Sequence, residues 1–326
     1  MNVCIYGVGA IGGWIGHQLA QTGATVSVVA RGQTLAALNA QGLQLVQGGV
    51  LTTQAVHASD NPALLGVQDV VVLAVKAPSL PDVARGIAPL LGPNTLVLTA
   101  MNGVPWWFLD GFGGQWAGRP LLTVDPSGAL ARAIPSHHLV GCVVHASCAL
   151  DAPGRARHHF GHKLIVGEPS GQPTPRVQAL AALLTQAGFE APISPHIQHD
   201  IWFKLWGNMT VNPISALTGA TTDLIMGDPL VLGLVSQVML EAKAVGAQLG
   251  ITIDQQPDDR HAVTRKLGAF KTSMLQDVQA RKPVELDALV GVVRELGQLT
   301  GVATPFTDAL LGLARLQARG LGLYPQ

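Results

Sequence analysis

Three polar side chains recur at intervals of four in the apolar, tryptophan-rich stretch IWFKLWGNMTVNPISALTG, residues 201–219. They are Lys204, Asn208 and Asn212. Four residues advance an α-helix by about 400°, so the three side chains share one face. A positioned ammonium can stabilise negative charge on an oxygen and supply a proton. Alternatively, Lys204 extends from an interface and the asparagines cap a break, since Pro213 predicts a kink or an end beside Asn212.

A second stretch with candidate chemistry is SMLQDVQARKPVELDALVG, residues 273–291. It reads as an apolar helix crossed by two polar residues, Ser273 and Glu285, the latter close to Pro283. Carboxylates are common near helix starts, where they interact favourably with the helix dipole. Position alone therefore does not separate a catalytic Glu285 from a structural one.

The motif GVGAIG follows a predicted strand and opens a predicted helix, which is the context that a dinucleotide-binding fingerprint requires. Its first glycine permits a tight turn, its second lets backbone N–H groups approach a pyrophosphate, and its third allows close packing of helix on strand. The sequence therefore predicts a dinucleotide site made by Gly7, Val8, Gly9, Ala10, Ile11 and Gly12.

The end of the second predicted strand indicates which dinucleotide binds. NAD-specific sites place an acid there, whereas this chain has Ala30-Arg31. A guanidinium can pair with a 2′-phosphate, so we expect NADP(H), although Arg31 could instead be a solvated residue at a helix start. Lys76 and Asn102 end two further strands at the sheet edge where ligands bind, and both are predicted to contact the cofactor. Asn102-Gly103 is also an ordinary turn signal.

The order of elements predicts two domains. The first half alternates β-branched runs with helical patterns, and its stretches at 69–76 and 94–103 each contain an apolar run, as in strands buried on both faces. Residues 1–194 are therefore expected to form a Rossmann-like, doubly wound parallel sheet, with extra strands after residue 120 and a short one at EAPISP. Residues 195–326 are expected to form an all-α substrate-binding and catalytic domain, with a break at 227–229.

Composition restricts the class of protein. Only 12% of the residues are charged and 48% are hydrophobic, which leaves room for a homodimer interface. Twenty basic residues balance twenty acidic ones, so neither nucleic acid nor an anionic membrane surface is an expected partner. Three cysteines without a zinc-site spacing favour reduced thiols and the cytoplasm. No uninterrupted apolar run reaches about 18 residues, so no membrane span is predicted.

Together these motifs resemble the ketopantoate reductase (2-dehydropantoate 2-reductase) family. The resemblance runs through nearly the whole chain and rests on the fingerprint, Ala30-Arg31, AVK at Lys76, MNG at Asn102, KLWGNMTVNPISALTG and SMLQDVQARKPVELD. It implies NADPH-dependent reduction of a small 2-oxo acid, 2-dehydropantoate, to (R)-pantoate in pantothenate biosynthesis.

The resemblance also implies a role for each matching residue. The lysine matching Lys204 is the general acid, and the glutamate matching Glu285 orients substrate and cofactor. The family's substrate-binding residues match Asn208, Asn212 and Ser273. Asn102 and Lys76 match residues near the nicotinamide and its ribose, and Asn102 is also expected to contact the substrate. The polar face of residues 204–212 would then line the cleft where nicotinamide and 2-oxo acid meet.

Several alternatives remain at this stage. The substrate could be another branched or aromatic 2-oxo acid, because the middle of the chain does not decide which side chain fits. A redox sensor could bind NADP(H) without turnover, and reductive aminases and sugar-acid dehydrogenases share a similar plan. No metal is expected, since the spacing of the central histidines fits no ligand signature: His137, His138, His145, His158, His159 and His162.

Overall fold

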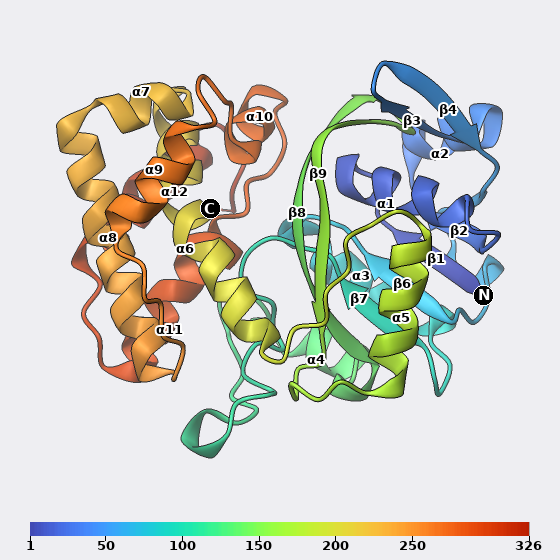
Figure 1. Ribbon diagram of the computed structural model, residues 1–326, viewed down its shortest axis with the longest axis horizontal. Coiled ribbons are helices and arrows are strands. Elements are labelled where there is room, and N and C mark those ends of the chain that lie inside the picture. Colours follow the sequence, from blue (N-terminus) through green and yellow to red (C-terminus); the bar gives the residue numbers. More distant parts are fainter. Residues whose placement is uncertain (326) are drawn as a thin grey trace. The chain divides into compact units, whose positions relative to one another are not determined.

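The computed structural model describes residues 1–325, which divide into two compact units. Unit 1 comprises Met1–Met101, Trp106–Pro120 and Ser127–Asp200, and unit 2 comprises Asn102–Pro105, Leu121–Pro126 and the remainder from Ile201. The division falls within helix α6 (Ile197–Thr218), which Figure 1 shows in yellow. Two short segments from the first half of the chain, one of them carrying Asn102, thus belong to the helical unit.

Unit 1 is built on one nine-stranded sheet with the order β4-β3-β9-β8-β7-β6-β1-β2-β5. The central strands β8-β7-β6-β1-β2-β5 run parallel, while β3 with β4 and β8 with β9 pair antiparallel. The strands are β1 (Asn2–Tyr6), β2 (Thr25–Val29), β3 (Leu43–Gln47), β4 (Val50–Gln54), β5 (His57–Ser59), β6 (Val70–Leu73), β7 (Leu96–Thr99), β8 (Leu139–Ala152) and β9 (Arg155–Gly167).

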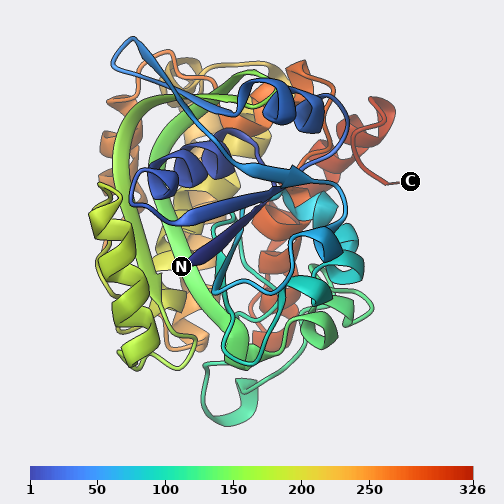
Figure 2. The ribbon, with the colours of Figure 1, turned by 90° about the vertical axis from the view of Figure 1, so that its right-hand side faces the viewer.

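Helices cover this sheet because its central strands are apolar on both faces. Every residue of β6 and β7 is buried, so each face needs an apolar layer against it. Helices α1 and α5 both contact β9, and Figure 2 shows them beside the long green strands in dark blue and yellow-green. The helices of unit 1 are α1 (Ala10–Ala20), α2 (Gly32–Gln41), α3 (Leu80–Gly86), α4 (Ala129–Ala133) and α5 (Pro175–Gln186). The predicted α/β fold is confirmed.

The sheet is larger and more mixed than the sequence analysis expected. The hairpin of β3 and β4 was missed, although Gly48 and Gly49 both have positive φ, as a two-residue type I′ turn requires. The short strand β5 was also missed. The expected strand at EAPISP is reduced to isolated bridges at Glu190 and Ile193. Strands β4 and β5 lie at the two ends of the sheet and are exposed or half-buried, so they lack the apolar runs that mark the central strands in the sequence.

Unit 2 is helical, as expected. Its elements beyond α6 are α7 (Thr222–Gly227), α8 (Pro229–Gln248), α9 (Pro257–Arg265), α10 (Ser273–Gln279), the π-helix η6 (Asp287–Gly291), α11 (Val292–Thr300) and α12 (Pro305–Gly320). The predicted break at 227–229 separates α7 from α8. There the Asp228 carboxylate caps α8 by accepting from the backbone N–H groups of Leu230 and Val231 at 2.9 and 3.0 Å.

Helix α8 is long and apolar enough to cross a bilayer by length and composition alone. The mean hydropathy of its most apolar 18-residue window is 1.5, and 39% of that window is buried. Its buried residues recur at helical spacing, at Val235, Val238, Met239, Ala242, Val245 and Gly246. One face therefore packs inside unit 2 while the other is exposed, and α8 is a partly buried core helix.

Candidate functional site

The predicted dinucleotide motif forms a tight strand-to-helix turn in unit 1. Gly7 has φ +99°, and a Cβ at Gly12 would lie 2.0 Å from the Gly7 carbonyl oxygen, so neither position accommodates a side chain. In contrast, a Cβ at Gly9 would meet nothing within 4 Å. Gly9 is the N-cap of α1 and offers no side-chain cap. The first turn of α1 thus presents its backbone N–H groups to open space, and this arrangement fits a dinucleotide pyrophosphate.

Arg31 stands between β2 and α2, where the sequence analysis expected a 2′-phosphate to bind. Its Nη1 lies 2.8 Å from Oδ2 of Asp82, and both side chains are exposed. Asp82 also pairs with Arg85. The sequence analysis missed Asp82, which lies 51 residues away in the chain. An exposed ion pair contributes little, so a phosphate can compete for the Arg31 guanidinium.

Lys76 and Asn102 follow neighbouring parallel strands, as predicted, but they belong to different units. Strand β6 ends at Leu73 and β7 at Thr99, three residues before Lys76 and Asn102 respectively. Lys76 is half-buried in unit 1, beside the short helical turn that starts at Ala77. Asn102 joins unit 2. The two residues therefore do not form one polar cluster within a single unit.

The polar face of α6 is present as the spacing predicted. Lys204 and Asn208 are half-buried, and Asn212 is buried. The Lys204 ammonium donates to the side-chain oxygen of Asn102 at 2.8 Å, a contact between residues 102 positions apart. Pro213 was predicted to kink or end α6 beside Asn212, and the helix does not end there. The helix continues through Pro213 to Thr218, because packing on both sides of the proline outweighs one missing backbone bond.

Two tryptophans hold the opposite face of α6 in the core of unit 2. Trp206 is completely buried, and its Nε1 donates to the carbonyl oxygen of Met239 in α8 at 2.8 Å. A Cβ at Gly246 of α8 would lie 2.5 Å from Nε1 of Trp202, so the two helices approach closely at that glycine. Trp206 lies two residues, or about 200°, from Lys204. Anchoring of the tryptophan face therefore leaves Lys204, Asn208 and Asn212 on the side away from α8.

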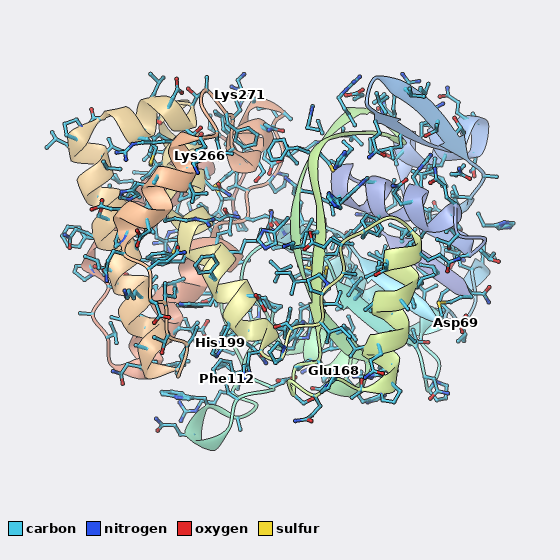
Figure 3. All side chains as sticks on the ribbon, viewed as in Figure 1. Asp69, Phe112, Glu168, His199, Lys266 and Lys271 are labelled. Carbon is cyan, nitrogen blue, oxygen red and sulfur yellow. The ribbon has the colours of Figure 1, made fainter. Side chains whose placement is uncertain are left out.

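Ser273 and Glu285 also belong to unit 2. Ser273 is the exposed first residue of α10, whose N-terminus is capped by Thr272, and Figure 3 labels Lys271 just before it. Glu285 is buried and lies two residues before the π-helix η6. Within residues 1–325, the side chains of Asn208, Asn212 and Ser273 form no hydrogen bond with another residue. These three groups are thus available to an external ligand.

The loop that carries Asn102 is fixed to η6. The backbone N–H of Val104 donates to the Ala288 carbonyl oxygen at 2.9 Å. A Cβ at Gly103 would lie 2.3 Å from the same oxygen, so only glycine permits this approach, and its φ is +83°. The 102–105 loop therefore connects α6, through the bond between Asn102 and Lys204, to η6, through the bond between Val104 and Ala288.

Arg260 is a half-buried cation beside α6 that no sequence motif marks. Its guanidinium carbon lies 5.5 Å from the ring centroid of Phe203, and a Cβ at Gly207 would lie 2.6 Å from its Nε. Within the described residues the guanidinium forms no ion pair, and burial lowers its pKa. The one indication in the sequence is Gly207, because a glycine in the middle of a helix often marks a place where another group packs closely.

Four of the six central histidines lie on the two long strands of the sheet. His145 is in β8, and His158, His159 and His162 are in β9. The ring of His158 stacks on Trp14 with centroids 5.1 Å apart. Among residues 1–325, no three or more His, Cys, Asp or Glu side chains gather as a metal site would require.

Comparison with known proteins gives a family match over both units. A family model described as "Ketopantoate reductase PanE/ApbA" matches residues 3–107, and one described as "Ketopantoate reductase PanE/ApbA C terminal" matches residues 196–318. A 2-dehydropantoate 2-reductase of Mesorhizobium japonicum is 45% identical over 325 residues, which cover 99% of this chain and 100% of that protein.

Solved structures agree with this match. A crystal structure from Ralstonia solanacearum, assigned only as a candidate ketopantoate reductase, has a TM-score of 0.96 and 55% identity and covers 99% of each chain. A 2-dehydropantoate 2-reductase from Geobacter metallireducens has a TM-score of 0.85 at 26% identity and covers 97% of this chain and 100% of that one.

Proposed function

This chain belongs to the ketopantoate reductase family, and on that premise we propose that it reduces 2-dehydropantoate to (R)-pantoate with NADPH in pantothenate biosynthesis. The observation that carries the proposal is the contact between Lys204 and Asn102 on the polar face of α6. A ketone reductase needs a proton donor held in one place, and this contact supplies one. The protein is accordingly an oxidoreductase with a small 2-oxo acid as its substrate.

Lys204 acts as the general acid in this proposal. NADPH, when bound, would supply the hydride for the ketone carbon. Negative charge then develops on the carbonyl oxygen, and the Lys204 ammonium stabilises that charge and donates its proton to the oxygen. Asn102 accepts one ammonium hydrogen at 2.8 Å, so it restricts the directions in which the other hydrogens point.

The remaining polar groups of unit 2 bind the substrate. Asn208, Asn212 and Ser273 have no internal hydrogen-bond partner among the described residues, and together they offer amide and hydroxyl groups for a carboxylate and a hydroxyl. Asn212 is the most buried of the three, so a ligand that hydrogen-bonds its amide would satisfy a group with little access to water. Glu285 orients the substrate and the cofactor, as in the family.

The family uses a nicotinamide cofactor, and we propose NADP(H) as the form bound here. The open first turn of α1 would hold the pyrophosphate, and the six residues of the fingerprint would contact it. Arg31, at the end of β2 where NAD-specific sites have an acid, would pair with the 2′-phosphate. Lys76 and Asn102 would contact the ribose and nicotinamide end.

We further propose that the protein is a homodimer and that it is located in the cytoplasm. The low content of charged residues and the exposed leucines of unit 2, among them Leu230 and Leu316, favour a homodimer. None of the three cysteines forms a disulfide, which favours a reducing compartment and hence the cytoplasm.

The decisive experiment is a panel of 2-oxo acids assayed by NADPH absorbance. We expect kcat/KM to be highest for 2-dehydropantoate and to be lower with NADH than with NADPH. A higher value for another branched or aromatic 2-oxo acid would redefine the substrate while retaining the reaction class. Tight binding of NADPH without oxidation by any of them would instead identify a non-catalytic sensor, and turnover only with added amine would identify a reductive aminase.

A further inference from the structure

The turn that carries Glu285 is held from both sides by residues 323 and 324. The backbone N–H of Val284 donates to the carbonyl oxygen of Leu323 at 3.1 Å. The Tyr324 hydroxyl donates to Oδ1 of Asp287 at 2.5 Å. The first bond lies one residue before Glu285 and the second lies two residues after it. Two consecutive residues therefore restrain Glu285 from both directions along the chain.

The restrained turn has an uncommon conformation. Asp287–Gly291 form a π-helix that continues into α11, and π-helical turns are rare and frequent at functional sites. The Glu285 carbonyl oxygen accepts from the N–H of Leu289 at 3.2 Å, so Glu285 itself is part of the first turn. A conformation that is intrinsically less stable than an α-helix needs external contacts to persist. The Tyr324 hydrogen bond is one such contact.

Segment 323–325 is itself fixed to α12. The Arg319 guanidinium carbon lies 5.6 Å from the Tyr324 ring centroid, and its Nε donates to the Pro325 carbonyl oxygen at 2.8 Å. Leu323 is buried. Burial raises the pKa of Asp287, and the Tyr324 hydroxyl and the guanidinium groups of Arg315 and Arg319 oppose that rise. The Tyr324 hydroxyl thus donates to the Asp287 carboxylate, which is held in place and partly shielded from water.

The same turn is also connected to Lys204 by two hydrogen bonds through the 102–105 loop. The Ala288 carbonyl oxygen accepts from Val104, and Asn102, two residues before Val104, accepts from the Lys204 ammonium. Displacement of η6 would therefore move the carboxylate of Glu285 and the partner of Lys204 together. Enzymes lose turnover when reacting groups shift by about 1 Å, even where binding is little changed.

We propose that Tyr324 and Asp287 are positioning residues, which hold Glu285 and the Asn102 loop in the geometry needed for reduction. This inference rests on the proposed function. Neither residue is assigned to substrate or cofactor, and both act through the turn between Glu285 and Ala288.

The test removes single groups from this contact. Tyr324→Phe removes only the hydroxyl, Asp287→Ala removes the acceptor, and Asp287→Asn keeps an oxygen acceptor. We expect kcat with 2-dehydropantoate, per NADPH-binding protein, to fall roughly 10- to 100-fold in the first two variants and less than threefold in the third. The double variant Tyr324→Phe/Asp287→Ala should be no worse than either single variant, because both remove one interaction.

Thr264→Ala serves as the matched control, because it removes a hydroxyl that bonds only within α9, to the Arg260 carbonyl oxygen at 3.0 Å. We expect it to leave kcat unchanged. Amide hydrogen exchange provides a readout that does not need activity: residues 284–291 should exchange at least tenfold faster in Tyr324→Phe and at the wild-type rate in the control.

A wild-type kcat in Tyr324→Phe would overturn the inference, and so would an unchanged rate of amide exchange at residues 284–291. The inference would also fail if turnover fell only in proportion to the amount of folded protein. If the wild-type protein reduced no 2-oxo acid, the proposed function would fail. The exchange measurement would then decide by itself whether Tyr324 holds the turn.

Discussion

Arg31 provides the sharpest test of cofactor choice, because the structure already shows what competes for it. Its guanidinium pairs with Asp82 at 2.8 Å, with exposed fractions of 68% and 40% for the two side chains. At such exposure, solvent limits the pair to about 0.2–1 kcal/mol. A charge-assisted contact with a 2′-phosphate contributes about 1.5–3 kcal/mol. The net gain on binding NADPH is therefore about 0.5–2.8 kcal/mol, or roughly a 2- to 100-fold change in Kd.

Titration of the purified protein with NADPH and NADH would measure this. Arg31→Ala should weaken NADPH binding roughly 2- to 100-fold and leave NADH binding within about twofold. Asp82→Ala should tighten NADPH binding up to about fivefold, because it releases Arg31. Arg85→Ala is the matched control, since Arg85 is also exposed and also pairs with Asp82. Equal losses for both cofactors in Arg31→Ala, or an equal loss in Arg85→Ala, would refute the assignment.

Four further predictions concern catalysis and stability. Lys204→Ala should lower kcat about 10²- to 10⁴-fold with normal NADPH affinity, measured per folded protein beside a thermal melt; near-normal turnover would remove the general acid. Asn212→Ala should raise the KM for the 2-oxo acid roughly tenfold, and weakened NADPH binding in the absence of substrate would contradict this role. Arg281 has φ +55° at the end of α10, so Arg281→Gly should raise the free energy of unfolding in urea by about 0.5–1 kcal/mol. Burial lowers the pKa of the His17 imidazole below its ordinary 6.5. As the pH drops below about 6.5, the unfolded chain therefore binds a proton more readily than the folded chain does, and the free energy of unfolding should fall. His17→Asn should show a shallower fall in urea titrations at pH 7.5 and 5.5.

The sequence alone predicted those features that depend on neighbours along the chain. The fingerprint at 7–12 specifies a strand, a glycine turn and a helix, because each requirement is met within a few residues. The interval of four in α6 places Lys204, Asn208 and Asn212 on one face wherever the helix lies. The same local reasoning did not decide whether the helix ends at Pro213, where packing of the flanking turns maintains it, and it overlooked the Gly48-Gly49 hairpin despite a clear turn signal.

Tertiary structure decided which distant residues meet. Asn102 belongs to the helical unit and binds Lys204, although its sequence position placed it at the end of a sheet strand. Asp82 was identified as the partner of Arg31, and Tyr324 as the partner of Asp287, only from the folded chain. The physical reason is that local backbone geometry fixes the direction of a side chain within its own helix or turn. Contacts between residues far apart depend on how whole elements pack, and no local pattern encodes them.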